Sequence, residues 1–413
     1  MDELGVVLRS ARPQALATLT RLLGDVDFAE DVLQEACARA VSAWRDGHVP
    51  DLPAAWLVRS ARNYAIDLHR KDALGERHRD RLQGVFDGDA DRWRRIEVDA
   101  CEPVRDDLLR LLFTCCHPEL PDEARIALTL KAIGGLSVAE IATAFLVSPD
   151  AMEQRITRAK RRIRERRIPY QSPSEADLPE RLDSVCAVVY LIFNEGYKSA
   201  QGPEVRRDRL AAEAVRLGRV VASLFRNEPE VSGLLALMLL QHARRSARVA
   251  PDGDVVLLED QDRTRWDREA IAEGRALVDR ALRRGSPGPY QIQAAIAGVH
   301  AAARSFEDTD WAEIAALYRL LEIHDRSPVV RLNRAVAVAR VDGASAGLSL
   351  ITSIAGLPQI ARYPYFHAVR AQLLAESGET RAAQAAYQDA LSCTTNERER
   401  AALERRLRDF DVA

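Results

Sequence analysis

The sequence has no excess of charge of either sign, few aromatic residues and no long apolar run. Its 59 basic and 62 acidic side chains leave a formal net charge of −3, which by itself argues against a protein that binds polyanions through overall charge. No stretch of roughly 18 uncharged apolar residues occurs, so we expect no membrane-spanning segment. The first residues carry acids where a secretory signal has bases, and we expect a cytoplasmic protein.

The six cysteines are scattered and do not have the spacing of a disulfide framework. Cys115, Cys116 and His117 are adjacent, but a structural zinc site needs four ligands and no second pair of cysteines lies nearby. We therefore expect reduced cysteines that pack as small apolar residues, with no metal and no cofactor.

Apolar residues recur at spacings of three and four along almost the whole chain, which predicts an all-α fold. The length of 413 residues exceeds what one core supports, so we expect several domains. Two stretches without periodicity separate them, the first with eight acids and four arginines and the second with three prolines among polar residues. The predicted order is a helical unit at 10–85, an acidic linker at 86–107, a second unit at 108–167, a linker at 168–181 and a helical remainder at 182–410.

The most specific segment lies at 136–163. Ser137 and Glu140 predict a capping box that opens a short helix, and Ser148 followed by Pro149 predicts the start of a second helix. Eight bases and one acid lie between 155 and 167. Two helices joined by a short turn, the second one basic, are typical of a helix-turn-helix that enters the major groove. The basic residues taken alone fit a solvated helix at a domain end as well.

The start of such a second helix reaches base edges, while its basic side chains hold phosphates and release counterions. The candidate DNA contacts are Ser148, Pro149, Asp150, Arg155, Arg158, Lys160, Arg161 and Arg162.

Two further helices are predicted at 28–45 and 53–71. The second presents a tryptophan, arginines and an asparagine at helical spacing, which suits single-stranded nucleic acid because a base can stack while phosphates are neutralised. A tryptophan buried between helices explains the same pattern, and both interpretations stay open. The candidate contacts are Trp56, Arg59, Arg62, Asn63 and Arg70.

Together these segments resemble the extracytoplasmic-function (ECF) class of bacterial sigma factors. AEDVLQEA at 29–36 resembles region 2.2, WLVRSARNYAIDLHRK at 56–71 resembles regions 2.3 and 2.4, and LSVAEIATAFLVSPDAMEQRITRAKRRIRE at 136–165 resembles region 4.2. The resemblance covers residues 10–165. In region 4.2, Leu146 stands where glycine is usual and Ala151 where threonine is common, which predicts an altered turn and the loss of one hydroxyl.

The resemblance implies that the chain binds core RNA polymerase, through its β′ clamp and β flap, and promoter DNA. It implies that Asp31, Gln34 and Glu35 face the β′ clamp, that the 56–70 candidates act at the −10 element as it melts, and that the 148–162 candidates read the −35 element.

The second half resembles the group-42 sigma factors, whose C-terminal extension carries tetratricopeptide-like repeats. The resemblance rests on five segments: YLIFNEGY (190–197), LLALMLLQHARRSAR (234–248), LLEDQDRTRWD (257–267), GPYQIQAAIAGVHA (288–301) and SPVVRLNRAVAVA (327–339). Gly378, Ala383 and Tyr387 also stand where such a repeat has small and aromatic residues, although any helix pair with alanine at its crossing fits too. The extension implies control of sigma activity within one chain, with an unidentified protein or ligand as its partner.

Within the extension, Asn194, Glu195 and Tyr197 are candidates for a regulatory contact, and capping of their own helix is the alternative. The sequence has no glycine-rich phosphate loop, nucleophile elbow or zinc-protease helix, so we do not expect an enzyme. The alternative function is a ligand-regulated helix-turn-helix protein that binds an operator. That alternative explains 136–163 but not the helix pair at 28–71.

Overall fold

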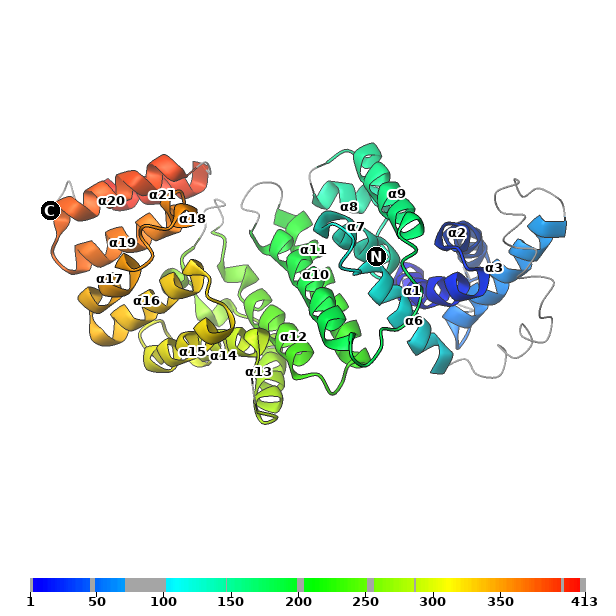
Figure 1. The fold of residues 1–413 in the computed structure, drawn as a ribbon, viewed down its shortest axis with the longest axis horizontal. Helices are drawn as coiled ribbons and strands as arrows, with labels where there is room; N and C mark the ends of the chain where they lie inside the picture. The colour runs from blue at the N-terminus through cyan, green and yellow to red at the C-terminus, as the bar shows by residue number, and fades with distance from the viewer. Residues whose placement is uncertain are drawn as a thin grey trace. The chain divides into compact units, whose positions relative to one another are not determined.

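The computed structural model describes residues 3–44, 49–70, 102–145, 147–198, 204–250, 256–285, 287–394 and 397–408. Within these ranges every regular element is helical and no strand occurs, which confirms the predicted all-α fold (Figure 1). The chain forms two compact units, Met1–Gly196 with Val205–Leu217, and Tyr197–Glu204 with Gly218–Ala413. We describe each unit by itself.

The helices that lie wholly or mostly in unit 1 are α1 (Glu3–Leu23), α2 (Val26–Ala43), α3 (Pro53–Arg70), α6 (Glu102–Cys115), α7 (Asp122–Ala132), α8 (Val138–Ala144), α9 (Pro149–Glu165), α10 (Leu178–Lys198) and α11 (Glu204–Leu224). Helices α1, α2 and α3 pack on one another. Leu16, Leu19, Leu33 and Leu57 are almost completely buried among them, as the apolar periodicity of these segments requires.

Helices α8 and α9 form the helix-turn-helix. The Ser137 hydroxyl accepts a hydrogen bond from the Glu140 backbone N–H, and the Glu140 carboxylate accepts one from the Ser137 backbone N–H, so the predicted capping box is present. The Ser148 hydroxyl caps α9 by accepting a bond from the Ala151 N–H, with Pro149 as the first helical residue. Leu146, in the turn, lies outside the described residues.

The two segments predicted as linkers are partly structured. Residues 102–107 belong to α6, and the buried Asp107 carboxylate accepts a 2.6 Å bond from Arg21 Nε of α1. The acidic composition of 86–107 predicts a linker, but acidic residues also favour the first turn of a helix, where they complement the helix dipole. Composition alone therefore does not distinguish a linker from the start of α6. In the second segment, the Tyr170 hydroxyl donates to the backbone oxygens of Ala17 and Asp107 at 2.8 and 3.2 Å.

The predicted boundary near 168–181 also differs from the division into units, because α10 and most of α11 belong with the helices before them. Arg181 donates to the Phe113 carbonyl at 2.6 Å, and the Ser184 hydroxyl donates to the Cys116 carbonyl at 2.7 Å. Arg216 of α11 donates to the Ile133 carbonyl at 3.1 Å. These bonds satisfy carbonyl oxygens at the ends of α6 and α7, which a helix leaves without internal partners.

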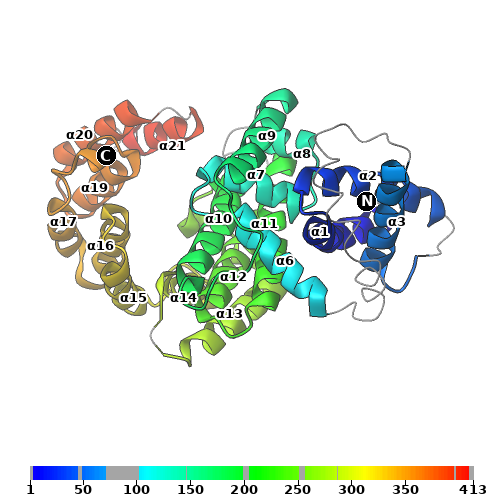
Figure 2. The same ribbon diagram turned by 45° about the vertical axis from the view of Figure 1, so that its right-hand side comes forward.

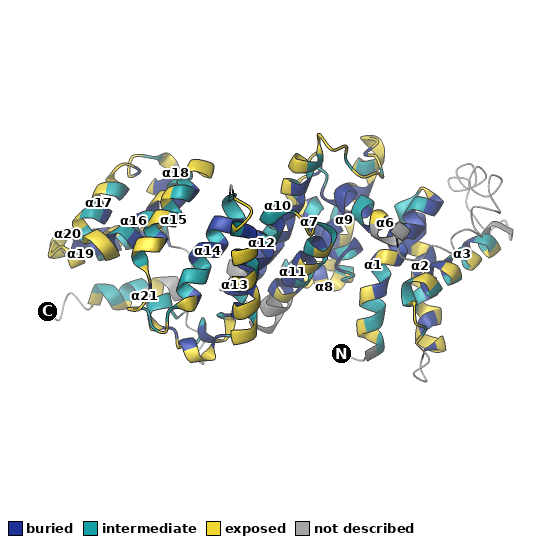
Figure 3. Ribbon diagram, turned by 90° about the horizontal axis from the view of Figure 1, so that it is seen from below, coloured by how far each residue is buried: buried dark blue, intermediate teal, exposed yellow. Residues whose placement is uncertain are grey.

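The helices of unit 2 are α12 (Pro229–His242), α13 (Arg268–Leu282), α14 (Pro289–Ala302), α15 (Trp311–His324), α16 (Pro328–Asp342), α17 (Ala344–Thr352), α18 (Pro358–Ala361), α19 (Pro364–Glu376), α20 (Thr380–Cys393) and α21 (Glu397–Arg408), with short 3-10 turns at 245–247, 258–260 and 263–265. Successive helices pack as pairs, among them α12 with α13, α15 with α16 and α19 with α20 (Figure 2). The buried side of each helix faces its neighbours (Figure 3).

Gly378 allows the sharp turn between α19 and α20, because its φ of +82° is a conformation that a residue with a Cβ avoids. Ala383, Ala386 and Tyr387 then pack against Ala371 in one cluster. The small and aromatic residues therefore lie at a helix crossing, while the assignment to tetratricopeptide repeats stays a prediction. Among the described residues, no helix combines the length and the apolar character needed to cross a membrane.

Candidate nucleic-acid interface and polymerase-binding face

Helix α9 has a buried apolar side and an exposed basic side. Met152, Ile156 and Ala159 are at most 3% exposed, as predicted from their spacing. Arg158, Arg161 and Arg162 are exposed, and so are Ser148, Pro149 and Asp150 at the capped end. The end that would meet base edges and the arginines that would meet phosphates are both open to solvent.

Two basic residues of α9 are engaged within the protein. Arg155 is half-buried and pairs with Glu123 of α7 at 3.1 Å. Lys160 is only 9% exposed, and its Nζ lies 2.7 Å from an Asp27 carboxylate oxygen and 3.0 Å from a Glu30 carboxylate oxygen on α2. The pattern of basic residues predicts Lys160 on the DNA-facing side of α9, whereas in the structure it faces α2. A contact of Lys160 with DNA therefore requires this pair to open.

The charges around Lys160 keep it protonated. Burial lowers its pKa, but the carboxylates of Glu30 and Asp27 raise it by more, and the net shift is upward. Arg164 adds a second cation at 3.2 Å from Asp27, and Lys131 of α7 lies 3.1 Å from Glu30. Three cations from the helix-turn-helix domain and two carboxylates of α2 thus form one network, which we call the α2–α9 clasp (Asp27, Glu30, Lys131, Lys160 and Arg164).

The clasp was not predicted from the sequence, although a signal for it was present. Glu30 lies between buried Ala29 and buried Val32, and a carboxylate in an apolar stripe needs a cationic partner. Lys160 in turn follows Ile156 by four residues, which places it beside the apolar side of α9.

The predicted polymerase-binding residues lie on the side of α2 away from its core. Asp31 and Gln34 are exposed, and Glu35 is half-buried and accepts a 2.9 Å bond from Arg39 one turn later. Val32, Leu33 and Ala36 are buried on the other side. The structure therefore brings these three polar side chains together, one turn from the clasp carboxylates.

Helix α3 carries the predicted −10 residues. Arg59 and Asn63 are exposed, and Arg62 is half-buried. Arg70 ends α3, but its side chain lies outside the described residues. Trp56 is half-buried, with its ring edge-on to buried Trp44, their centroids 5.1 Å apart. The Trp56 ring thus packs against Trp44 in the bundle, while the residue as a whole keeps part of its surface exposed.

The candidate regulatory residues lie close to the C-terminal end of a helix. Helix α10 continues to Lys198, so Asn194, Glu195 and Tyr197 are helical. Asn194 is half-buried and Glu195 exposed, and the side chain of Tyr197 lies outside the described residues. Their regulatory role and the alternative, capping of their own helix, both stay predictions.

Cys115 and Cys116 are buried at the end of α6. Burial raises the pKa of the Cys116 thiol to about 11, so it is neutral at physiological pH and packs as a small apolar group. In the part of the chain that the structure describes, no group of three or more His, Cys, Asp or Glu residues could hold a metal.

Three family models match successive parts of the chain. Residues 7–74 match Sigma-70 region 2, and residues 110–163 match Sigma-70, region 4. Residues 181–282 match a family of unknown function, DUF6596. The region 2 match contains α2 and α3, and the region 4 match contains α8 and all of α9 except its last two residues.

Relatives with similar sequences fall into two groups. An uncharacterized protein of Rhizobium meliloti (strain 1021) is 46% identical over 398 residues, 96% of this chain and 93% of the relative. The ECF RNA polymerase sigma factor SigL of Mycobacterium tuberculosis is 33% identical over 148 residues, 35% of this chain and 77% of SigL. The probable ECF RNA polymerase sigma factor SigI of the same species is 31% identical over 169 residues, 40% of this chain and 56% of SigI. No solved structure matches the chain.

Proposed function

The chain belongs to the ECF RNA polymerase sigma factors, and we propose that it directs core polymerase to promoters by reading a −35 element and melting a −10 element. The α2–α9 clasp opens in this process, under control of the chain's own C-terminal extension. One observation carries the sigma assignment. The capped, basic helix-turn-helix and the α2–α3 pair with its acidic and tryptophan-bearing faces occur in one chain, in the order of sigma regions 2 and 4.

For the −35 element, we propose that the capped start of α9 lies in the major groove. The exposed Arg158, Arg161 and Arg162 contact phosphates on either side, which adds affinity without sequence information. Ser148, Pro149 and Asp150 lie where base edges would be read, while Arg155 and Lys160 become available only when their partners on α7 and α2 release them.

For the −10 element, we propose that the accessible part of Trp56 stacks on a base of the melted strand. Arg59, Arg62 and Arg70 neutralise the phosphates of that strand, and Asn63 hydrogen-bonds a base edge. Duplex opening is thereby stabilised by a binding surface that only the single strand can use.

For core polymerase, we propose that Asp31, Gln34 and Glu35 dock on the β′ clamp, with the helix-turn-helix domain near the β flap. The clasp residues Asp27 and Glu30 lie on the same helix, one turn away. While α9 is held there, α2 and α9 cannot separate to follow polymerase and the −35 element independently.

The extension is in position to influence the clasp. Helices α10 and α11 bond directly to the ends of α6 and α7, and α7 supplies Lys131 to the clasp. We propose that a change in the extension reaches α7 and α9 through these bonds.

Glu30→Gln and Lys131→Gln should then both raise run-off transcription at limiting core enzyme. Unchanged transcription in both variants would show that the clasp does not control sigma activity.

A ligand-regulated operator-binding protein remains the second candidate, because α8 and α9 alone would serve it. The two functions differ in their need for polymerase. An operator-binding protein binds its duplex tightly by itself, whereas a sigma factor should bind promoter DNA well only together with core enzyme. Electrophoretic mobility shifts with and without core polymerase separate them.

A further inference from the structure

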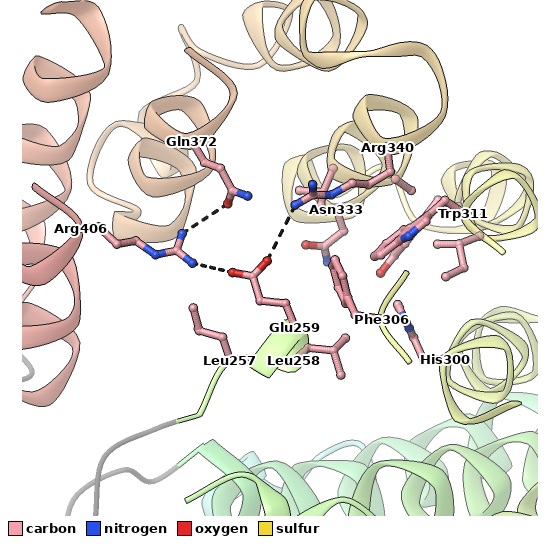
Figure 4. A pocket seen from close by; sticks show the side chains of 14 residues that line it. Leu257, Leu258, Glu259, His300, Phe306, Trp311, Asn333, Arg340, Gln372 and Arg406 are labelled. Atoms are coloured by element: carbon pink, nitrogen blue, oxygen red, sulfur yellow. Dashed lines mark hydrogen bonds and ion pairs between the residues drawn. The ribbon is translucent and has the colours of Figure 1, made fainter. Parts of the chain in front are cut away.

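Unit 2 contains a pocket of about 280 Å³ between the 258–260 turn and helices α14, α15, α16, α19 and α21 (Figure 4). Its two sides differ in chemistry. One is aromatic, with Phe306 edge-on to Trp311 at 5.1 Å and His300 edge-on to Trp311 at 5.3 Å. The other is polar, with Arg340 and Arg406 directed at one carboxylate, that of Glu259, and with Gln372 facing Arg406.

The polar side forms an anion site. Glu259 Oε1 lies 2.7 Å from Arg406 Nη2, and Glu259 Oε2 lies 3.9 Å from Arg340 Nη2. Arg406 is oriented by a 3.4 Å bond to Gln372, and Arg340 by Glu376 at 3.5 Å and by the Phe306 ring beneath it. Guanidinium groups from two helices, α16 and α21, thus converge on a single carboxylate.

The carboxylate comes from the 3-10 turn at 258–260 and not from a helix of the stack. The residues on either side of this turn are anchored, because the Val256 N–H donates to the Arg248 carbonyl at 2.8 Å and buried Gln261 donates to the Val256 carbonyl at 3.0 Å. A competitor therefore needs to displace only the Glu259 side chain.

Leu257 is 41% exposed, and Leu258 is half-buried. The side chains of Glu259, Arg340 and Arg406 are each about one-third exposed. Ion pairs at such exposure contribute only about 0.2–1 kcal/mol, so a competing carboxylate can displace Glu259 at small cost.

The aromatic side is uncharged at physiological pH. Burial, with the nearby charges of Arg244 and Arg263, lowers the pKa of His300 to about 4. The volume lies just below the roughly 300–1,000 Å³ of pockets that enclose small molecules, and it suits one or two side chains of a peptide. One wall of the pocket is itself a peptide segment, two leucines followed by a glutamate.

We propose that this pocket binds a peptide segment of a partner protein in which an apolar residue precedes an acid, and that Leu257-Leu258-Glu259 is its built-in competitor. The partner carboxylate takes the place of Glu259 between Arg340 and Arg406. An apolar side chain of the partner enters against Trp311 and Phe306. That peptide binding here regulates sigma activity rests on the proposed function. That the pocket binds the peptide does not.

The test uses the full chain and a fluorescent peptide that copies residues 256–262, Val-Leu-Leu-Glu-Asp-Gln-Asp, measured by fluorescence polarisation. Glu259→Gln weakens the internal competitor, so this variant should bind the peptide about fivefold more tightly than the unmodified chain, about 1 kcal/mol. Adding Arg406→Gln should abolish that binding. Arg408→Gln makes the same change of charge two residues further along α21, at a residue that does not line the pocket, and should leave binding intact.

A peptide with glutamine in place of its glutamate should not bind, and thermal unfolding of each variant shows that the fold is kept. The proposal fails if the Glu259→Gln chain does not bind the peptide, if it binds no more tightly than the unmodified chain, or if Arg406→Gln leaves binding unchanged. None of these results depends on polymerase or promoter, so a failure here leaves the sigma assignment standing.

Discussion

Lys160 is a cation held almost out of solvent by two carboxylates of another helix. Removing one partner of such a buried pair leaves charge without compensation and costs more than the pair contributes. We predict that Glu30→Gln lowers the free energy of unfolding by about 1–3 kcal/mol, because Lys160 and Lys131 both lose a charged partner. Urea titration of the two proteins measures this difference in the free energy of unfolding.

The matched control for Glu30→Gln is Glu165→Gln. Glu165 pairs with Arg161 of the same helix at 3.4 Å, with both side chains about two-thirds exposed. This change should cost no more than about 0.5 kcal/mol. Equal losses of unfolding free energy in the two variants would show that the clasp stabilises the fold no more than an exposed ion pair does.

The exposed arginines of α9 give a second prediction at this scale. Arg158→Ala and Arg161→Ala should each weaken binding of the holoenzyme to promoter duplex and each reduce the slope of log affinity against log salt by about one. Arg280→Ala on α13 removes an exposed arginine from a helix outside the interface and should change neither quantity. Unchanged affinity and slope in the α9 variants would exclude both arginines from the interface.

At the scale of the element, helix starts were predictable and helix partners were not. The caps at Ser137 and Ser148 follow from local sequence rules, because the bonded atoms are three residues apart. The linker assignment failed at Asp107, since its partner Arg21 lies 86 residues earlier. The candidate residues on α3 were predictable as a face, whereas the contact between Trp56 and Trp44 needed the three-dimensional structure.

Helix α3 also permits a test that separates its two roles. Trp56→Ala should impair open-complex formation more than closed-complex formation, by roughly 10- to 100-fold, because a stacked base contributes about 1–3 kcal/mol. Permanganate reactivity of the −10 region measures opening. Trp56→Phe keeps a ring against Trp44 and should retain most of the activity. If Trp56→Ala reduces both complexes equally, the ring serves only to pack the bundle.

At the scale of the molecule, the division into units did not follow the composition of the sequence. The proline-rich stretch before α10 looked like a domain boundary, yet Val185, Val188 and Val189 of α10 are completely buried within unit 1. Burial of this kind depends on which surfaces meet, and prolines in a segment mark a turn without showing whether the chain leaves the domain.

This division predicts the behaviour of truncated chains. A chain ending at Arg167 loses the partners of Phe113 and Cys116 and exposes the apolar surface that α10 covers. It should unfold at a lower temperature and less cooperatively than a chain ending at Leu224, which keeps α10 and α11. Differential scanning calorimetry measures the unfolding temperature and the cooperativity of both chains. Equal values in the two chains would contradict the assignment of α10 to unit 1.

The most direct test of the sigma assignment is run-off transcription from a promoter mapped through transcripts that rise when the protein is overproduced. Purified core enzyme should start transcription at that promoter only when this chain is added, and the chain alone should bind the promoter duplex weakly. Tight binding of the duplex by the chain alone, with no transcript in the presence of core enzyme, would contradict the account.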